Sequence, residues 1–214
     1  MSPQGLIIIN ASKFGREIYT WAQQAIQAGA PWFVKGFLDD RPDILRGFTY
    51  DVPILGSAED HEPASDELFL IAIGEPDAKK RYCQMLESKG ARFATLIHPT
   101  AVVGHDVHIG EGSVIGPLTQ LSCDITLGKQ VCFGTNSNTA HDTRIGDYTQ
   151  VSGSCEINGN AELGQGVFLG SHATILPTVR VGDRAYIGAG SVVLKNVKPG
   201  VKMFGNPAVQ IGLA

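Results

Sequence analysis

The residues best suited to do chemistry in this chain are a neighbouring histidine and aspartate, His141 and Asp142. An imidazole titrates near neutral pH, so it can take a proton from an amine or a hydroxyl as that group attacks a thioester carbonyl. An adjacent carboxylate can orient the ring or raise its basicity. We therefore predict that His141 is the general base of an acyl transfer and that Asp142 is its partner. The alternative is a histidine exposed at a turn, with no catalytic role.

A repeat of six residues must position this pair. Seventeen consecutive hexads run from Ile97 to Val197, and in sixteen of them the first residue is a branched aliphatic or phenylalanine. The second residue is glycine in ten hexads, and the fifth is always small or β-branched. This pattern predicts a parallel β-helix in which each hexad makes one short strand and one corner, with the aliphatic side chain pointing into the core. We expect the glycines to supply the backbone conformations that a tight corner needs.

One hexad breaks the pattern. It begins with Thr139 and contains His141, and local rules often fail at functional sites. If three hexads make a coil, residues eighteen apart lie in one column, which places His105 and Cys123 in line with His141. His105 is therefore a rival base, and a metal bound by all three is a further alternative. Coils about 4.8 Å apart cannot bring all three ligands within about 2 Å of one ion without a partner chain, so we expect no metal.

The first part of the chain has a different pattern. Short apolar runs at residues 6–10, 32–38 and 68–73 alternate with helical patterns, and the second helix is expected over residues 77–89. Alternation of this kind is typical of a small parallel α/β domain. We therefore predict an α/β domain over residues 1–95, followed by an all-β domain over residues 96–214.

A ligand of such an α/β sheet binds beyond the carboxyl ends of the strands. The N–H groups that open the first helix favour a phosphate, and a carboxylate after the second strand can accept sugar hydroxyls. A dinucleotide loop would read G-x-G-x-x-G, and only Gly15 is present, so NAD is disfavoured. A turn without a ligand is the alternative. The candidate substrate-binding residues are Ser12, Lys13, Phe14, Asp39, Asp40 and Gly74.

Composition excludes several other classes of protein. The 214 residues carry a net charge of −4, which is unlike the basic surface of a nucleic-acid-binding protein. No apolar run reaches membrane-spanning length, and the first residues lack the features of a signal peptide. The four cysteines have neither disulfide-framework nor zinc-site spacing. We expect a cytoplasmic protein that binds neither nucleic acid nor membranes.

The motifs resemble those of a known family. The hexads are similar to the left-handed β-helix of hexapeptide-repeat acyltransferases, and residues 205–208 are similar to the G-N-P-A motif that closes that fold. Residues 37–40 and 71–74 match the F-L-D-D and I-A-I-G motifs of bacterial sugar acetyltransferases of the NeuD/PglD type, the sialic acid O-acetyltransferases and nucleotide-amino-sugar N-acetyltransferases. Residues 140–148 resemble the family's H-[DE]-x-x-I-G-[DE]-[FY] segment, whose histidine is the catalytic base. The loop at residues 10–15 differs from the family's G-A-S-G-H-G at two glycines and the histidine.

This resemblance implies a Rossmann-like first domain that binds a sugar or nucleotide-sugar. It also implies a homotrimer in which acetyl-CoA, the acetyl donor, lies in a groove between neighbouring subunits. Lys195, Lys198 and Lys202 could meet CoA phosphates or simply be solvated. The cofactor-binding positions that the family implies are Gln150, Gly159, Gly170, Ser171 and Ala189.

The function expected from the resemblance is transfer of acetyl to the amino group of a nucleotide-linked amino-sugar, in bacterial surface polysaccharide biosynthesis. The reaction would be a direct attack with His141 as base. One alternative is O-acetylation of a sialic acid or another sugar, for which the altered first loop would fit a different acceptor. Another alternative is a non-catalytic β-helix that serves as an assembly module.

Overall fold

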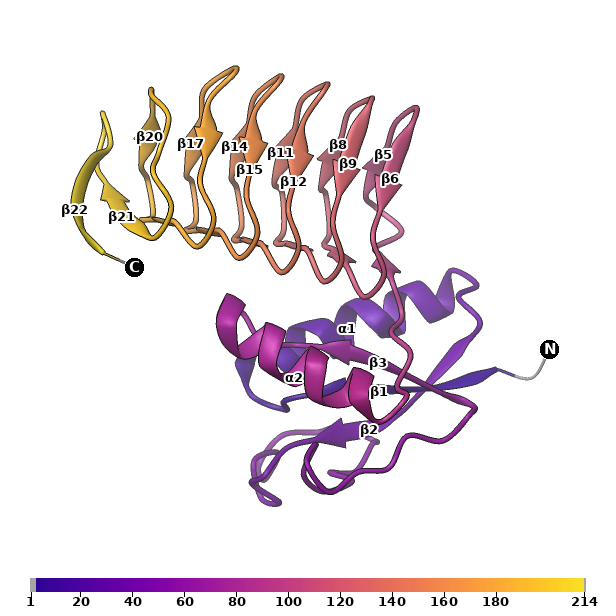
Figure 1. The fold of residues 1–214 in the computed structure, drawn as a ribbon. Helices are drawn as coiled ribbons and strands as arrows, with labels where there is room; N and C mark the ends of the chain where they lie inside the picture. Colours follow the sequence, from indigo (N-terminus) through magenta and orange to yellow (C-terminus); the bar gives the residue numbers. More distant parts are fainter. Residues whose placement is uncertain (1–2, 214) are drawn as a thin grey trace. The chain divides into compact units, whose positions relative to one another are not determined.

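The computed structural model describes residues 3–213 (Figure 1). These residues form two compact units that divide between Pro99 and Thr100, four residues beyond the domain boundary expected from the sequence. The first unit is α/β and the second is a β-solenoid. No helix within residues 3–213 is both long and apolar enough to cross a membrane.

The first unit contains a parallel three-stranded sheet with the order β2-β1-β3. Its strands are β1 (Gln4–Ile9), β2 (Trp32–Leu38) and β3 (Glu67–Ile71). Isolated parallel bridges extend both edges of the sheet, from Phe37 to Ile54 and from Phe69 to Phe93. The central strand β1 is a run of aliphatic residues because its last four side chains are almost completely buried. Because the three strands are parallel, their carboxyl ends lie along one edge of the sheet.

Two helices pack against this sheet, α1 (Lys13–Gln27) against β1 and β2, and α2 (Pro76–Ser88) against β3. The buried side chains of α1 follow helical spacing, at Ile18, Trp21, Ala22 and Ala25. The helix α2 begins at Pro76, one residue before the predicted start, and Glu75 caps it by accepting hydrogen bonds from the second and third helical N–H groups. A short strand, β4 (Leu96–Ile97), ends this part of the chain.

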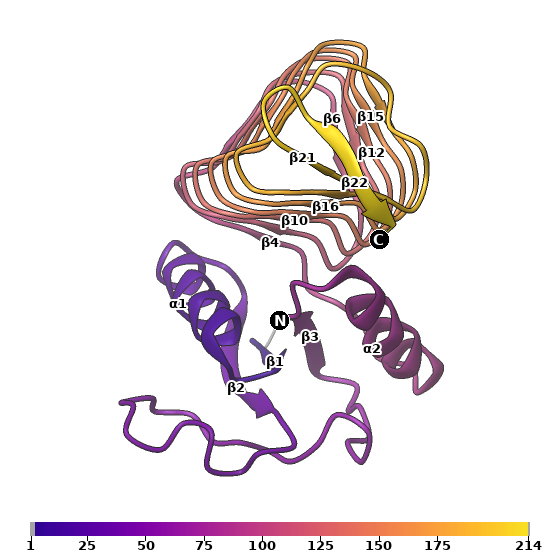
Figure 2. The ribbon, with the colours of Figure 1, turned by 90° about the vertical axis from the view of Figure 1, so that its left-hand side faces the viewer.

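The second unit is a three-sided solenoid whose strands pair in parallel with residues eighteen apart (Figure 2). Face 1 contains β7 (Val114–Ile115), β10 (Cys132–Phe133), β13 (Gln150–Val151), β16 (Phe168–Leu169) and β19 (Tyr186–Ile187), followed by β21 (Val201–Phe204) and the antiparallel β22 (Val209–Leu213). Face 2 contains β5 (Val102–Val103), β8 (Gln120–Leu121), β11 (Asn138–Thr139), β14 (Glu156–Ile157), β17 (Thr174–Ile175) and β20 (Val192–Val193). Face 3 contains β6 (Val107–Ile109), β9 (Ile125–Leu127), β12 (Arg144–Ile145), β15 (Glu162–Leu163) and β18 (Arg180–Val181).

The first residue of most hexads points into the solenoid core, as the repeat predicts. Leu121, Phe133 and Ile157 are almost completely buried there. Val103 is an exception, with 38% of its surface exposed. It lies in β5, the last strand at its end of face 2, so only one neighbouring strand of that face pairs with it.

The prediction about the hexad glycines was wrong. Positive φ angles occur at the fourth residue of every hexad except the first and the last, for example 51° at Asp106 and 57° at Asp142, and not at the glycine in the second position. The glycines are needed because the coils approach closely: a Cβ atom at Gly104 would lie 1.8 Å from the carbonyl oxygen of Ser122. Asp and Asn tolerate the left-handed conformation better than most residues, which explains why they recur at the fourth position.

Candidate active site

His141 and Asp142 lie at the corner between face 2 and face 3, where the chain passes from β11 to β12. Their side chains are 57% and 56% exposed, and Nδ1 of His141 is 2.7 Å from Oδ2 of Asp142. An ionised carboxylate can only accept a hydrogen bond, so Nδ1 carries the proton in this pair. Nε2 is then left with the lone pair that a general base requires.

The coil that follows supports the imidazole of His141. A Cβ atom at Gly159 would lie 2.8 Å from both Cε1 and Nε2 of the ring, so any side chain at this position would displace the ring. The backbone of the histidine is also held, because its carbonyl oxygen accepts a hydrogen bond of 3.0 Å from the N–H of Asn160. Gly159, expected from the family as a cofactor contact, therefore lies directly beside the predicted base.

The rival base, His105, lacks a comparable partner. It is exposed in the first coil and makes no ion pair or hydrogen bond through its ring within residues 3–213. The carboxylate that follows it, Asp106, pairs instead with Nε2 of His108 at 3.1 Å. The motif His-Asp thus occurs twice in this column, but the two side chains meet only at His141.

The metal alternative involves Cys123, in the coil between the two histidines. A hydrogen bond with Asp124 and partial burial raise the pKa of this thiol, so it is held in the protonated form that binds metals poorly. Within residues 3–213, no group of three or more His, Cys, Asp or Glu side chains is arranged to hold a metal ion.

The other cofactor-binding candidates lie away from His141. Gly170 and Ser171 lie at the corner between face 1 and face 2, and Ala189 lies in the same column one coil later. Gln150 lies in β13 of face 1 and is 6% exposed. One chain therefore brings only Gly159 next to His141, while Gly170, Ser171 and Ala189 line the opposite edge of face 2.

The predicted substrate loop of the first unit is tightly ordered. Asn10 adopts a φ of 78°, the conformation for which the first glycine of G-A-S-G-H-G would be suited. Its side-chain oxygen accepts from the N–H of Ser12, and its amide nitrogen donates to the carbonyl of Ala72. Gly15 is required for helix packing, because a Cβ atom there would lie 1.8 Å from the carbonyl oxygen of Asn10. The loop thus keeps its shape with only one glycine.

Asp39 fixes this loop to the second strand. Its carboxylate accepts a hydrogen bond of 2.9 Å from the N–H of Ala11 and is held by the guanidinium of Arg41, at 2.9 Å from each of its oxygens. Burial raises the pKa of Asp39, but the hydrogen bonds from Arg41 and Ala11 outweigh burial and hold the pKa below its ordinary value. Both oxygens are therefore occupied, whereas Asp40 and Lys13 are exposed beside them. Phe14 and Gly74 are half-buried at the same edge of the sheet.

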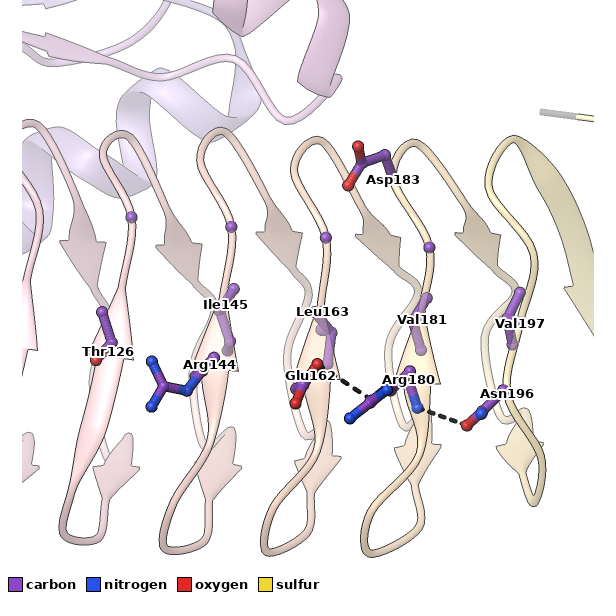
Figure 3. Close-up of a pocket in the computed structure, with 14 residues that line it drawn as sticks. Thr126, Arg144, Ile145, Glu162, Leu163, Arg180, Val181, Asp183, Asn196 and Val197 are labelled. Atoms are coloured by element: carbon purple, nitrogen blue, oxygen red, sulfur yellow. Dashed lines mark hydrogen bonds and ion pairs between the residues drawn. The ribbon is translucent and has the colours of Figure 1, made fainter.

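Face 3 carries a groove that the sequence reasoning missed (Figure 3). The groove has a volume of about 470 Å³ and crosses β9, β12, β15 and β18. Its charged strand residues, Arg144, Glu162 and Arg180, are spaced by eighteen and point outward, a regularity visible in the sequence once the coil length is known. Arg144 follows His141 by three residues, but neither His141 nor Asp142 lines the groove.

Comparison with known proteins gives the family. A family model described as bacterial transferase hexapeptide (six repeats) matches residues 160–195. The UDP-N-acetylbacillosamine N-acetyltransferase of Bacillus subtilis (strain 168) is 34% identical over 95 residues, which are 44% of this chain and 44% of that relative. WeeI from Acinetobacter baumannii AYE is 30% identical, and its structure matches 97% of this chain and 99% of its own with a TM-score of 0.85. The chain belongs to the bacterial hexapeptide-repeat sugar acetyltransferases.

The fold of the hexapeptide-repeat sugar acetyltransferases extends over both units. PerB from Caulobacter crescentus, in complex with CoA and GDP-perosamine, is 24% identical and matches 97% of each chain with a TM-score of 0.86. The match to the Bacillus relative, in contrast, covers less than half the length of that protein. Because the chain belongs to this family of sugar acetyltransferases, its solenoid is the left-handed β-helix that the hexads resemble.

Proposed function

We propose that this protein transfers an acetyl group from acetyl-CoA to the amino group of a nucleotide-linked amino-sugar. The observation that carries the proposal is the His141–Asp142 pair, with Nδ1 engaged by the carboxylate at 2.7 Å and Nε2 directed away from it. The names of the relatives support the substrates, because the Bacillus relative is an N-acetyltransferase of a UDP-sugar and PerB was crystallised with CoA and GDP-perosamine.

In the proposed reaction the acceptor nitrogen attacks the thioester carbonyl carbon directly. As the N–C bond forms, Nε2 of His141 takes a proton from the nitrogen, and Asp142 stabilises the imidazolium through Nδ1. The tetrahedral intermediate then expels the CoA sulfur, which receives the proton from Nε2. The products are the N-acetyl sugar and free CoA. The raised pKa of the Cys123 thiol favours this direct attack over an acylated cysteine.

We propose that the site is completed by a second subunit of a homotrimer. The predicted base lies at one edge of face 2, and Gly170 and Ala189 lie at its other edge. If face 2 packs against neighbouring subunits, the base of one chain meets the Gly170 corner of the next, and acetyl-CoA lies between them. The outward residues of face 2 support this, because only Glu156 among them is charged: Val102, Gln120, Asn138, Glu156, Thr174 and Val192.

The first unit would hold the acceptor as a Rossmann-like domain. Lys13 and the N–H groups that open α1 lie at the carboxyl edge of its parallel sheet, where a phosphate is favoured. Asp40 remains exposed for sugar hydroxyls, whereas Asp39 serves to hold the loop. The departure of residues 10–15 from the family's loop favours a second candidate function, O-acetylation of a different sugar acceptor.

The test is release of free thiol from acetyl-CoA in the presence of UDP-, dTDP- and GDP-linked 4-amino-sugars and of sialic acid. We expect turnover with one acceptor, and a loss of kcat of about 10²–10⁴-fold in His141→Ala, because a positioned general base contributes that much. His105→Ala is the matched control and should keep wild-type turnover. Full activity of His141→Ala would overturn the proposed mechanism. Light scattering of the same samples should give the mass of three chains, and a monomer with full activity would exclude the shared site.

A further inference from the structure

The groove on face 3 contains one charge that the chain does not balance. Four charged side chains line it. Arg180 and Glu162 form an ion pair at 3.3 Å, and Asp183 accepts a hydrogen bond of 3.0 Å from the N–H of Gln165. Arg144 makes no ion pair or hydrogen bond through its guanidinium within residues 3–213. Three of the four charges are therefore used inside the chain and one is left over.

The neighbours of Arg144 explain why it stays unpaired. Its register partners on face 3 are Thr126 on one side and Glu162 on the other. Glu162 turns toward Arg180, and the guanidinium of Arg144 points away from it, toward Thr126 (Figure 3). The side of the groove next to Thr126 thus presents an exposed cation beside a neutral hydroxyl-bearing residue.

We infer that Arg144 binds a phosphate group of one of the two substrates in the face 3 groove. A guanidinium has a planar set of donors that matches two phosphate oxygens at once. Arg144 is three residues beyond the predicted base, at the start of the strand that leaves its corner. This inference rests on the proposed function, which supplies two phosphate-bearing ligands, CoA and a nucleotide-sugar. Both carry a diphosphate, which is the shared chemistry.

Binding measurements identify which ligand supplies the phosphate. Isothermal titration of the full chain with CoA and, separately, with the nucleoside diphosphate of the active acceptor (UDP, dTDP or GDP) compares wild type, Arg144→Ala and Arg144→Lys. We expect Arg144→Ala to raise the Kd of one of the two ligands about tenfold or more and to leave the other unchanged, because a charge-assisted bidentate contact is lost. The lysine variant should restore part of the affinity and should show a steeper loss of binding with added salt than wild type.

Arg184→Ala is the matched control. It removes an exposed arginine of the same solenoid that does not line the groove, so both Kd values should stay within about twofold of wild type. Unchanged Kd values in Arg144→Ala, or a change of oligomeric mass without a change of affinity, would overturn the inference while leaving the proposed function intact. If wild type binds neither CoA nor any of UDP, dTDP and GDP, both the proposed function and this inference fail.

Discussion

The imidazole of His141 lies in the space that a side chain at position 159 would fill. A Cβ atom built at position 159 would lie 2.8 Å from two atoms of the ring, Cε1 and Nε2. Asp142 holds one ring nitrogen at 2.7 Å. The orientation of Nε2 is therefore set both by the carboxylate and by the absence of a side chain at Gly159.

Gly159→Ala should rotate the ring away from Asp142. The variant should fold normally, since Gly159 has no positive φ, but kcat should fall at least tenfold, because a displacement of about 1 Å at a catalytic group can cost about 10²-fold. Steady-state kinetics on the thiol-release assay would measure this. The matched control is Gly153→Ala, in the same hexad position, where the nearest atom to the new Cβ is 3.3 Å away. Equal kcat in the two variants would contradict the positioning role.

The sequence offers His141 and His105 as candidate bases but does not contain the feature that distinguishes them. Asp106, Asp124 and Asp142 all occupy the left-handed fourth position of their hexads, where aspartate is favoured for backbone reasons alone. A His-Asp dipeptide at this position is therefore weak evidence of a catalytic pair. The deciding feature is the rotamer of each carboxylate, which depends on neighbours such as His108 that the dipeptide does not contain.

At the level of the coil, Thr139 is a local defect in the core. Its side chain points inward like the aliphatic residues of the other hexads and is 2% exposed, and its hydroxyl has no hydrogen-bond partner within residues 3–213. From the sequence alone, this threonine indicates a functional site near His141. The structure gives it an inward position in β11, so its effect falls on the stability of the coil.

Thr139→Val should stabilise the protein by about 1 kcal/mol, because it removes a buried hydroxyl without a partner and keeps the shape of the side chain. Chemical denaturation would measure the change in the free energy of unfolding. The contrasting variant is Ser137→Ala, which removes a hydroxyl that donates to Ser152 at 2.7 Å and accepts from Cys155 at 3.1 Å and should cost about 1 kcal/mol. A loss of stability in Thr139→Val would show that the hydroxyl has a partner, such as a buried water.

The hexad period predicted the solenoid and its corners well, because the strands from β5 to β17 pair only with residues eighteen away and need no distant context. The role of the glycines was misassigned because a glycine in a repeat has two uses, an unusual φ or a close approach, and the pattern alone does not separate them. The face 3 groove was missed for a different reason. The unpaired charge in this groove depends on which arginine Glu162 pairs with. Both Arg144 and Arg180 are in register with Glu162, so the sequence does not decide between them.

Tryptophan fluorescence reports on the first of the two units alone. Both tryptophans, Trp21 and Trp32, lie in the first unit. That unit also contains Glu67, a carboxylate with 2% exposure that is 2.6 Å from Nζ of Lys35 and 2.9 Å from Nε2 of His61. Burial raises the pKa of Glu67, but the hydrogen bonds from the Ala64 N–H, Lys35 and His61 outweigh it and bring the pKa from an ordinary 4.5 to about 2.

Acid should therefore destabilise the first unit over a defined range. The folded pKa of Glu67 lies below the ordinary value, so its contribution is complete above about pH 4.5 and is lost as the pH falls toward 2. Thermal unfolding followed by tryptophan fluorescence should show a falling midpoint over this range. Glu67→Gln should lower stability by about 2 kcal/mol at neutral pH and flatten the pH dependence, leaving the part that Asp39 contributes. An unchanged pH dependence in Glu67→Gln would assign the acid sensitivity to other groups.

The pairing of the coils from β5 to β17 with residues eighteen positions away also restricts how such a chain can change in length. Loss or gain of one whole coil leaves each remaining residue on its own face and changes only the length of the solenoid. A deletion of six residues preserves the hexad pattern in the sequence but moves every following hexad onto a different face of the solenoid. Such a deletion between positions 141 and 170 would move the Gly170 column to a different edge, so natural variation in this segment should occur in multiples of eighteen.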